Sequence, residues 1–135
     1  MATEMDSLSA NRVWTLTDLP KGRKVIGCRW VFKNKTGSTG KLIRYKARLV
    51  ARGFAQIKGA DYNETFSPVV RGESLRTMFA VTVQCRCQIH QLDVETAFLN
   101  GVLDEEVFMD QPEGNEIRGK EHLVCRLHKS LYGLK

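Results

Sequence analysis

The sequence lacks any apolar run of the roughly eighteen residues that a membrane-spanning helix needs. It also lacks the pattern of a secretory signal, because no basic segment followed by an apolar stretch occurs near the start. We therefore expect an intracellular protein without membrane contact, whose cysteines stay reduced. The chain of 135 residues is long enough to bury one modest hydrophobic core.

Paired metal-binding spacings are missing as well. Cys and His residues occur close together at 85–90 and at 122–128, but neither group contains the C-x2-C pair typical of zinc sites. We expect these to be ordinary side chains. The stretch TGSTGK does not match the phosphate-binding loop G-x4-G-K-[ST], because Lys35 stands where the first glycine is required and Leu42 follows the lysine.

Acidic residues are absent from a long segment of the chain. Residues 21–60 contain twelve Lys or Arg, more than half of the 21 in the protein, and no Asp or Glu. Residues 91–121 show the opposite balance, with nine acidic residues and two basic ones. The first segment is suited to bind polyanions, and the second could hold cations.

The basic segment has the alternating pattern of a β-hairpin. Strands are predicted at 25–33 and 42–52, joined by a Gly-rich and Asn-containing loop at 34–41. Arg44, Lys46 and Arg48 fall on one face at intervals of about 7 Å, similar to the spacing of successive phosphates in a nucleic acid. A solvated strand face is the alternative, but we expect contact with a polynucleotide or a triphosphate.

Elsewhere the pattern predicts shorter elements. The chain after Gly72 has helical periodicity over about three turns, with Gly72 or Ser74 as N-cap. The remaining expectations are a short helix or lead-in at 1–20, an irregular connection at 60–70, strands at 88–94, 107–109 and 122–127, a short helical segment ending at 100–101, and the opening of a helix at 130–135.

Asp93 lies near the end of the predicted strand at 88–94, among apolar residues. It could cap the following helical segment, which is the commoner role, or hold a divalent cation. The acidic residues at 104–106 and Asp110 are expected to lie in a solvated loop.

Four stretches together resemble a known family. They are WTLTDLPKGRKVIGCRWVFKNK, RYKARLVARGFAQIKGADYNETFSPVVR, HQLDVETAFLNGVLDEEVFMDQPEG and VCRLHKSLYGLK. In this order and spacing, they resemble the reverse transcriptase of copia-type LTR retrotransposons, from about Met5 to Lys135. The resemblance implies an α+β fold, that of a right-hand polymerase, with an antiparallel sheet and packed helices. Residues 1–20 would be a lead-in, 21–70 mostly fingers and 71–135 the first part of the palm.

The resemblance also assigns roles to residues. Asp93 looks like the first catalytic aspartate, binding Mg²⁺ together with the Val94 carbonyl, and Phe98 looks like the residue that excludes the ribose 2′-hydroxyl. The candidates for contact with the template or the triphosphate are Arg44, Lys46, Arg48 and Arg52, and Tyr132 and Gly133 resemble the start of the next motif. The implied partners are an RNA template, a DNA primer, a deoxynucleoside triphosphate and the remainder of the Pol polyprotein.

The family's Y-x-D-D motif does not occur in the sequence. Because two-metal catalysis needs more than one carboxylate, we expect a truncated reverse transcriptase that is inactive by itself. The alternatives are a non-catalytic nucleic-acid-binding module and a non-functional transposon remnant.

Overall fold

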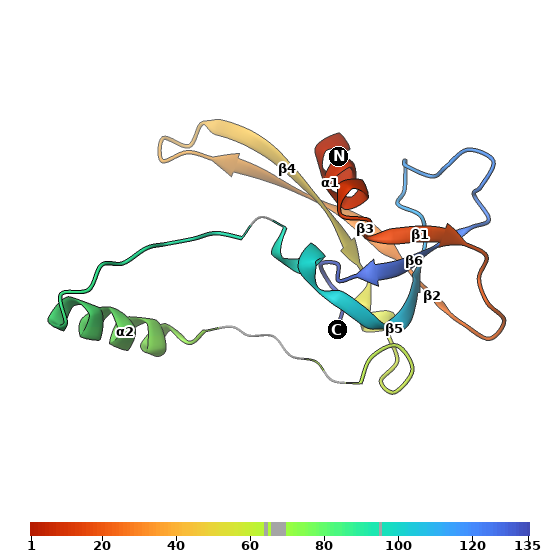
Figure 1. Ribbon diagram of the computed structural model, residues 1–135. Coiled ribbons are helices and arrows are strands. Elements are labelled where there is room, and N and C mark those ends of the chain that lie inside the picture. Colours follow the sequence, from red (N-terminus) through yellow and green to blue (C-terminus); the bar gives the residue numbers. More distant parts are fainter. Residues whose placement is uncertain (64, 66–69, 95) are drawn as a thin grey trace. The chain divides into compact units, whose positions relative to one another are not determined.

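The computed structural model describes every residue except 64, 66–69 and 95. The chain forms two units, which we describe separately (Figure 1). The first contains Met1–Glu64 and Thr96–Lys135, and the second contains Thr65–Glu95. Across the part of the chain that the structure describes, no helix is both long and apolar enough to span a membrane.

The first unit is built on a four-stranded sheet. Its strand order is β1 (Trp14–Thr17), β6 (Val124–Lys129), β5 (Val102–Met109) and β2 (Val25–Ile26). β1 and β5 are antiparallel to β6, whereas β2 is parallel to β5. The sheet is therefore mixed, and the expectation of an antiparallel sheet does not hold for the β2–β5 pair. Apolar alternation predicts which face of a strand is buried, but it carries no information on strand direction.

The core lies against this sheet. Leu8 of helix α1 (Ala2–Ala10) and Val13 are each 1% exposed, so the N-terminal segment belongs to the core of this unit. Met109 of β5 and Cys125 of β6 are completely buried beside them. With helices and strands both present, the fold is of the expected α+β class.

A long hairpin makes up the second sheet of this unit. It consists of β3 (Cys28–Thr36) and β4 (Leu42–Ala51), which pair antiparallel from Cys28 opposite Ala51 outward. The register is regular as far as Lys35, where it shifts. The predicted hairpin is confirmed. Leu49 and Ala51 are buried at its base, while Phe32 and Tyr45 are 65% and 76% exposed further out.

The second unit contains helix α2 (Gly72–Gln84), which confirms the predicted helix. Its N-cap is Arg71, which has an extended backbone and makes no capping hydrogen bond with its side chain. The expectation of Gly72 or Ser74 as N-cap was therefore wrong. No residue of this helix is buried, whereas α1 packs within the first unit through Leu8.

Other expectations also differ from the structure. Residues 88–94 form no strand, since the described part of the second unit contains no partner strand. The acidic residues 104–106 lie within β5 and not in a loop, because the strand extends back from 107 to Val102. Glu106 there pairs with Arg126 of β6 at 2.8 Å.

The C-terminal segment 130–135 is a turn and not the start of a helix. Leu134 donates its backbone N–H to the Leu131 carbonyl at 3.3 Å, and Gly133 has a φ of +88°. A positive φ at that position interrupts a right-handed helix. Two single helical turns, η1 (Gly53–Ala55) and η2 (Ala97–Asn100), flank the region where this segment lies; η2 ends at Asn100 before Gly101, as predicted.

Candidate functional site

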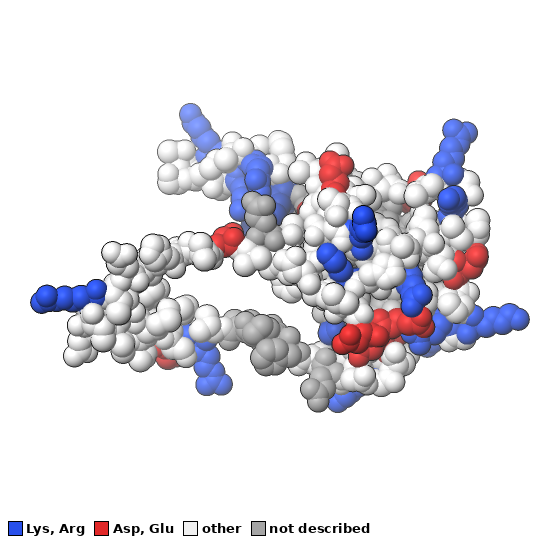
Figure 2. Space-filling model, viewed as in Figure 1, with Lys and Arg blue, Asp and Glu red and all other residues white. Residues whose placement is uncertain are grey.

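The hairpin register brings more cations together than the sequence pattern showed. Lys33 lies opposite Lys46, and Lys35 lies opposite Arg44. Directly opposite residues of an antiparallel pair share a face, so two lysines of β3 join the cations predicted on β4. Arg29, opposite Val50, lies on the same side nearer the base of the hairpin. We call the five cations further out the cationic face: Lys33, Lys35, Arg44, Lys46 and Arg48. Figure 2 shows Lys and Arg side chains gathered over the hairpin.

Repulsion between the members of the cationic face lowers the pKa of one of them, Lys46. The pKa of Lys46 is lowered, chiefly by the positive charge of Arg48, with smaller contributions from burial, Lys35 and Arg44. Glu4 of α1 opposes this only weakly. Among the described residues, both ion pairs involve Glu106, and neither includes a member of the cationic face. A bound polyanion would relieve the repulsion.

Three of the predicted site residues meet at the base of the hairpin. The Arg48 guanidinium carbon lies 5.1 Å from the centroid of the Tyr132 ring, within cation–π range. The Tyr132 and Phe98 ring centroids are 4.5 Å apart, with the planes tilted by 46°. Phe98 is 52% exposed, so its ring remains open to a ligand. Residues from β4, η2 and the C-terminal segment thus form one cluster.

Backbone hydrogen bonds position the C-terminal segment in this cluster. The Ala51 N–H donates to the Tyr132 carbonyl at 2.8 Å, and the Gly53 N–H donates to the Gly133 carbonyl at 3.1 Å. The approach is so close that a Cβ on Gly53 would lie 2.0 Å from the Gly133 oxygen. A Cβ on Gly133 would lie 2.3 Å from the Ala51 oxygen. Only glycine fits at either position.

The predicted cations Arg44 and Arg52 lie near opposite ends of β4. Arg44 lies at the outer end of the hairpin, opposite Lys35. Arg52 follows the last residue of β4, and its backbone N–H donates to the Gly27 carbonyl at 2.8 Å. Its side chain runs past Gly27, where an added Cβ would lie 3.1 Å from the Arg52 Cδ. Arg52 therefore extends along the start of β3 and is not part of the register that defines the cationic face.

Asp93 lies in the second unit, on an exposed segment that is not a strand. Its apolar neighbours Leu92 and Val94 are 91% and 63% exposed, so the apolar residues around Asp93 are not buried. No group of three acidic, His or Cys side chains suited to a metal ion occurs among the described residues. A carboxylate such as that of Asp93 and a carbonyl such as that of Val94 are oxygen groups of the kind that Mg²⁺ prefers, but two such groups alone do not complete a metal site.

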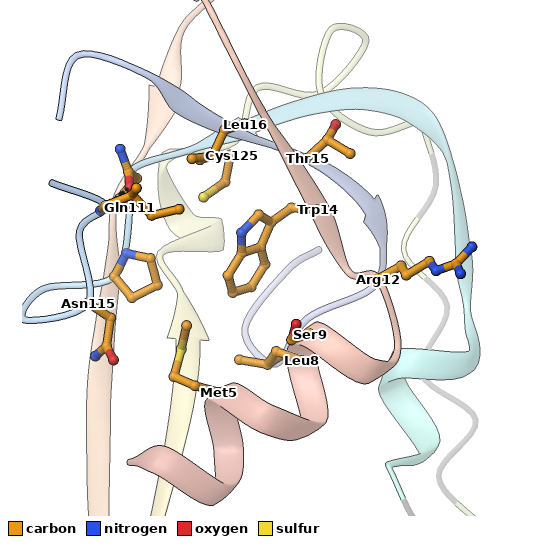
Figure 3. Close-up of a pocket in the computed structure, with 12 residues that line it drawn as sticks. Met5, Leu8, Ser9, Arg12, Trp14, Thr15, Leu16, Gln111, Asn115 and Cys125 are labelled. Atoms are coloured by element: carbon orange, nitrogen blue, oxygen red, sulfur yellow. Dashed lines mark hydrogen bonds between the residues drawn. The ribbon is translucent and has the colours of Figure 1, made fainter. Parts of the chain in front are cut away.

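A pocket of about 330 Å³ lies elsewhere in the first unit. Figure 3 shows the Trp14 ring projecting into it, between α1 and the loop that contains Gln111 and Asn115. The Asn115 side-chain nitrogen is buried without a hydrogen-bond partner among the described residues. None of the predicted site residues lines this pocket.

Comparison with known proteins identifies the family. The family model described as "Reverse transcriptase (RNA-dependent DNA polymerase)" matches residues 11–135. The chain belongs to this family, which confirms the resemblance seen in the sequence.

Three similar curated proteins are Pol polyproteins of plant transposons. The chain is 53% identical over its whole length to the "Retrovirus-related Pol polyprotein from transposon TNT 1-94" of Nicotiana tabacum. It is 46% identical to the corresponding polyproteins from transposons RE2 and RE1 of Arabidopsis thaliana. The chain spans only 10% of the first of these polyproteins and 9% of the other two. No solved structure gives a significant match.

A shorter relative also matches. The "Uncharacterized mitochondrial protein AtMg00820" of Arabidopsis thaliana is 49% identical over 84 residues, which are 62% of this chain and 49% of that protein.

Proposed function

We propose that these residues form the nucleotide-facing part of an RNA-directed DNA polymerase, with 21–70 mostly in the fingers and 71–135 in the first part of the palm. The observation that supports this best is the cluster of Arg48, Tyr132 and Phe98, because it unites three residues to which family resemblance assigns roles near the nucleotide. The proposed partners are an RNA template, a DNA primer, a deoxynucleoside triphosphate and the rest of a Pol polyprotein, inside the cell.

The cationic face supplies the phosphate contacts in this proposal. Arg48 is the candidate for the incoming triphosphate, since a guanidinium forms charge-assisted hydrogen bonds with phosphate oxygens. The other members of the face, together with Arg52, are candidates for the template backbone. Phe98 faces the sugar, and its exposed ring would exclude the additional 2′-hydroxyl of a ribonucleotide.

Asp93 and the Val94 carbonyl are proposed as the ligands that this stretch contributes to Mg²⁺. When bound, the metal would stabilise charge on the reacting phosphate oxygens. The described residues do not form such a site by themselves. Because the sequence contains no Y-x-D-D, the remaining carboxylates would come from outside these 135 residues. We therefore expect no polymerisation by this chain alone.

A second candidate function is nucleic-acid binding without catalysis. It is favoured by the cationic face, whose members have no ion-pair partner among the described residues. Five phosphate contacts to a single strand predict that log K falls with log salt at a slope of about −3.5.

Primer extension on an RNA template with Mg²⁺ tests these functions. The purified chain and an Asp93→Ala variant would be assayed side by side, with RNA binding measured on the same samples. We expect binding without incorporation. Incorporation that depends on Asp93 would refute the expected inactivity, because carboxylates within the chain would then suffice.

The salt slope tests the assignment of phosphate contacts. Lys33→Ala and Lys46→Ala should each make the slope about 0.7 less steep. Lys120→Ala, an exposed lysine outside the hairpin, is the matched control and should leave the slope unchanged. Binding that is independent of salt would refute the nucleic-acid contact.

A further inference from the structure

Tyr132 holds a central position in the cluster that sequence reasoning did not reveal. It is the residue that contacts both Arg48 and Phe98, while these two come from β4 and η2. Its hydroxyl makes no hydrogen bond with any described residue, so the ring itself carries the contacts. Tyr132 thus connects a phosphate-binding candidate to a sugar-facing one.

The position of the ring is fixed from both ends of its segment. Ser130 donates its N–H to the Gly101 carbonyl at 2.8 Å, next to η2. The Tyr132 carbonyl accepts from Ala51 at the end of β4, also at 2.8 Å. Lys135 donates its N–H to the Gln56 Oε1 at 2.8 Å, and Leu131 is only 2% exposed. The backbone therefore links the same two elements that the ring links.

We propose that Tyr132 is a positioning residue for nucleotide binding: its ring fixes the Arg48 guanidinium and the Phe98 ring relative to each other, so that triphosphate binding is coupled to discrimination against ribose. This inference rests on the proposed function, because Arg48 and Phe98 contact the nucleotide only if that function holds. Tyr132 itself acts through these two neighbours.

The charges around Arg48 explain why such a residue is needed. Arg48 and Lys46 repel each other on the cationic face, as the lowered pKa of Lys46 indicates, and a long Arg side chain without a fixed contact populates several rotamers. Contact with the Tyr132 ring favours one position of the Arg48 guanidinium. A cation–π contact of this kind typically changes an equilibrium about two- to fivefold. Loss of the ring would also leave Phe98 without its aromatic neighbour.

The first experiment examines the free chain by NMR. Tyr132→Ala should shift the Arg48 Nε–H signal and the Phe98 ring signals, because both lie near the aromatic ring, whereas the conservative variant Tyr132→Phe should keep them close to wild type. Tyr62→Ala is the matched control. It removes a similar contact, between the Tyr62 ring and the Lys135 ammonium at 5.4 Å, without touching Arg48. Unchanged Arg48 and Phe98 signals in Tyr132→Ala would overturn the inference.

The second experiment titrates the same variants with inorganic tripolyphosphate, dUTP and UTP, because the two nucleotides differ only in the 2′-hydroxyl. We expect Tyr132→Ala to bind tripolyphosphate about two- to fivefold more weakly and to lose a similar factor of the preference for dUTP over UTP. Tyr132→Phe should restore both values. Arg48→Ala should act mainly on tripolyphosphate binding and Phe98→Ala mainly on the sugar preference, whereas Tyr132→Ala should reduce both.

The outcomes distinguish failure of the positioning role of Tyr132 from failure of the proposed function. If the wild-type chain binds the probes and prefers dUTP, but Tyr132→Ala has the same affinities, the positioning role is refuted while the proposed function stands. If the wild-type chain binds none of the probes, the proposed nucleotide site fails and the inference fails with it. Should Tyr132→Ala not fold, Tyr132→Leu provides a non-aromatic side chain of substantial volume for the same comparison.

Discussion

Replacement of Gly133 by alanine is expected to detach the C-terminal segment from β4. Gly133 has a φ of +88°, and a Cβ there would lie 2.3 Å from the Ala51 oxygen and 2.7 Å from the Val50 Cγ1. A left-handed conformation costs an alanine about 1–2 kcal/mol. If the backbone moves away, the two hydrogen bonds from Ala51 and Gly53 are also lost, at about 0.5–1.5 kcal/mol each. The free energy of unfolding should fall by about 2–5 kcal/mol.

Alanine substitutions at two further glycines separate the cost of the left-handed conformation from the cost of the lost hydrogen bonds. Gly114 has a φ of +74° and open space around its hypothetical Cβ, so Gly114→Ala should cost only the conformational part of about 1–2 kcal/mol. Gly53 has no positive φ, but its Cβ would lie 2.0 Å from the Gly133 oxygen. Gly53→Ala should therefore cost about 1–3 kcal/mol through the lost hydrogen bonds. Each alanine also reduces the entropy of the unfolded chain, and this common effect cancels in the comparison.

Urea unfolding followed by the fluorescence of Trp14 and Trp30 measures all three variants. Both tryptophans are partly buried in the first unit, so their signals should report its unfolding. If Gly133→Ala and Gly114→Ala differ by less than about 0.5 kcal/mol, the close approach of 130–135 to β4 does not exist in solution. The placement of Tyr132 against Arg48 would then lose its structural basis.

The remaining predictions concern the thiols and Asp93. Burial raises the pKa of Cys28 to about 11 and that of Cys125 to about 12, from an ordinary value of 9.0, so iodoacetamide at pH 8 should modify the exposed Cys85 and Cys87 first, as read by mass spectrometry. Between pH 9 and 12 the folded protein retains the thiol protons of Cys28 and Cys125, whereas the unfolded chain loses them. The free energy of unfolding should therefore be unaffected by these thiols below pH 9 and fall from pH 9 to 12. A urea midpoint that stays constant over this range would contradict the burial of the two thiols. Asp93→Ala should change the free energy of unfolding by less than about 0.5 kcal/mol, since the side chain is exposed and makes no hydrogen bond with a described residue; a larger loss in urea unfolding would show a structural role.

Local pattern was sufficient for several elements. The alternation at 25–33 and 42–52 predicted the hairpin and its two faces, and the apolar spacing after Gly72 predicted α2. Asn100 and Gly101 also predicted the end of the short helical segment η2 correctly. These features depend on residues within a few positions of one another, so the sequence contains all the information that they need. The predicted strand containing Asp93 was wrong because a strand also needs a partner, which period alone does not supply.

The family was likewise determined by the sequence, since its motifs occur in order along the chain, and the family comparison confirms it. The roles of Asp93, Val94 and Phe98, together with the division into fingers and palm, stay predictions. What only the tertiary structure decided is which distant residues meet. The register placed Lys33 and Lys35 beside the cations of β4, and the packing of 130–135 placed Tyr132 between Arg48 and Phe98. Such contacts join segments far apart in the chain through strand pairing and steric fit, and neither property is encoded in the spacing of residues along one segment.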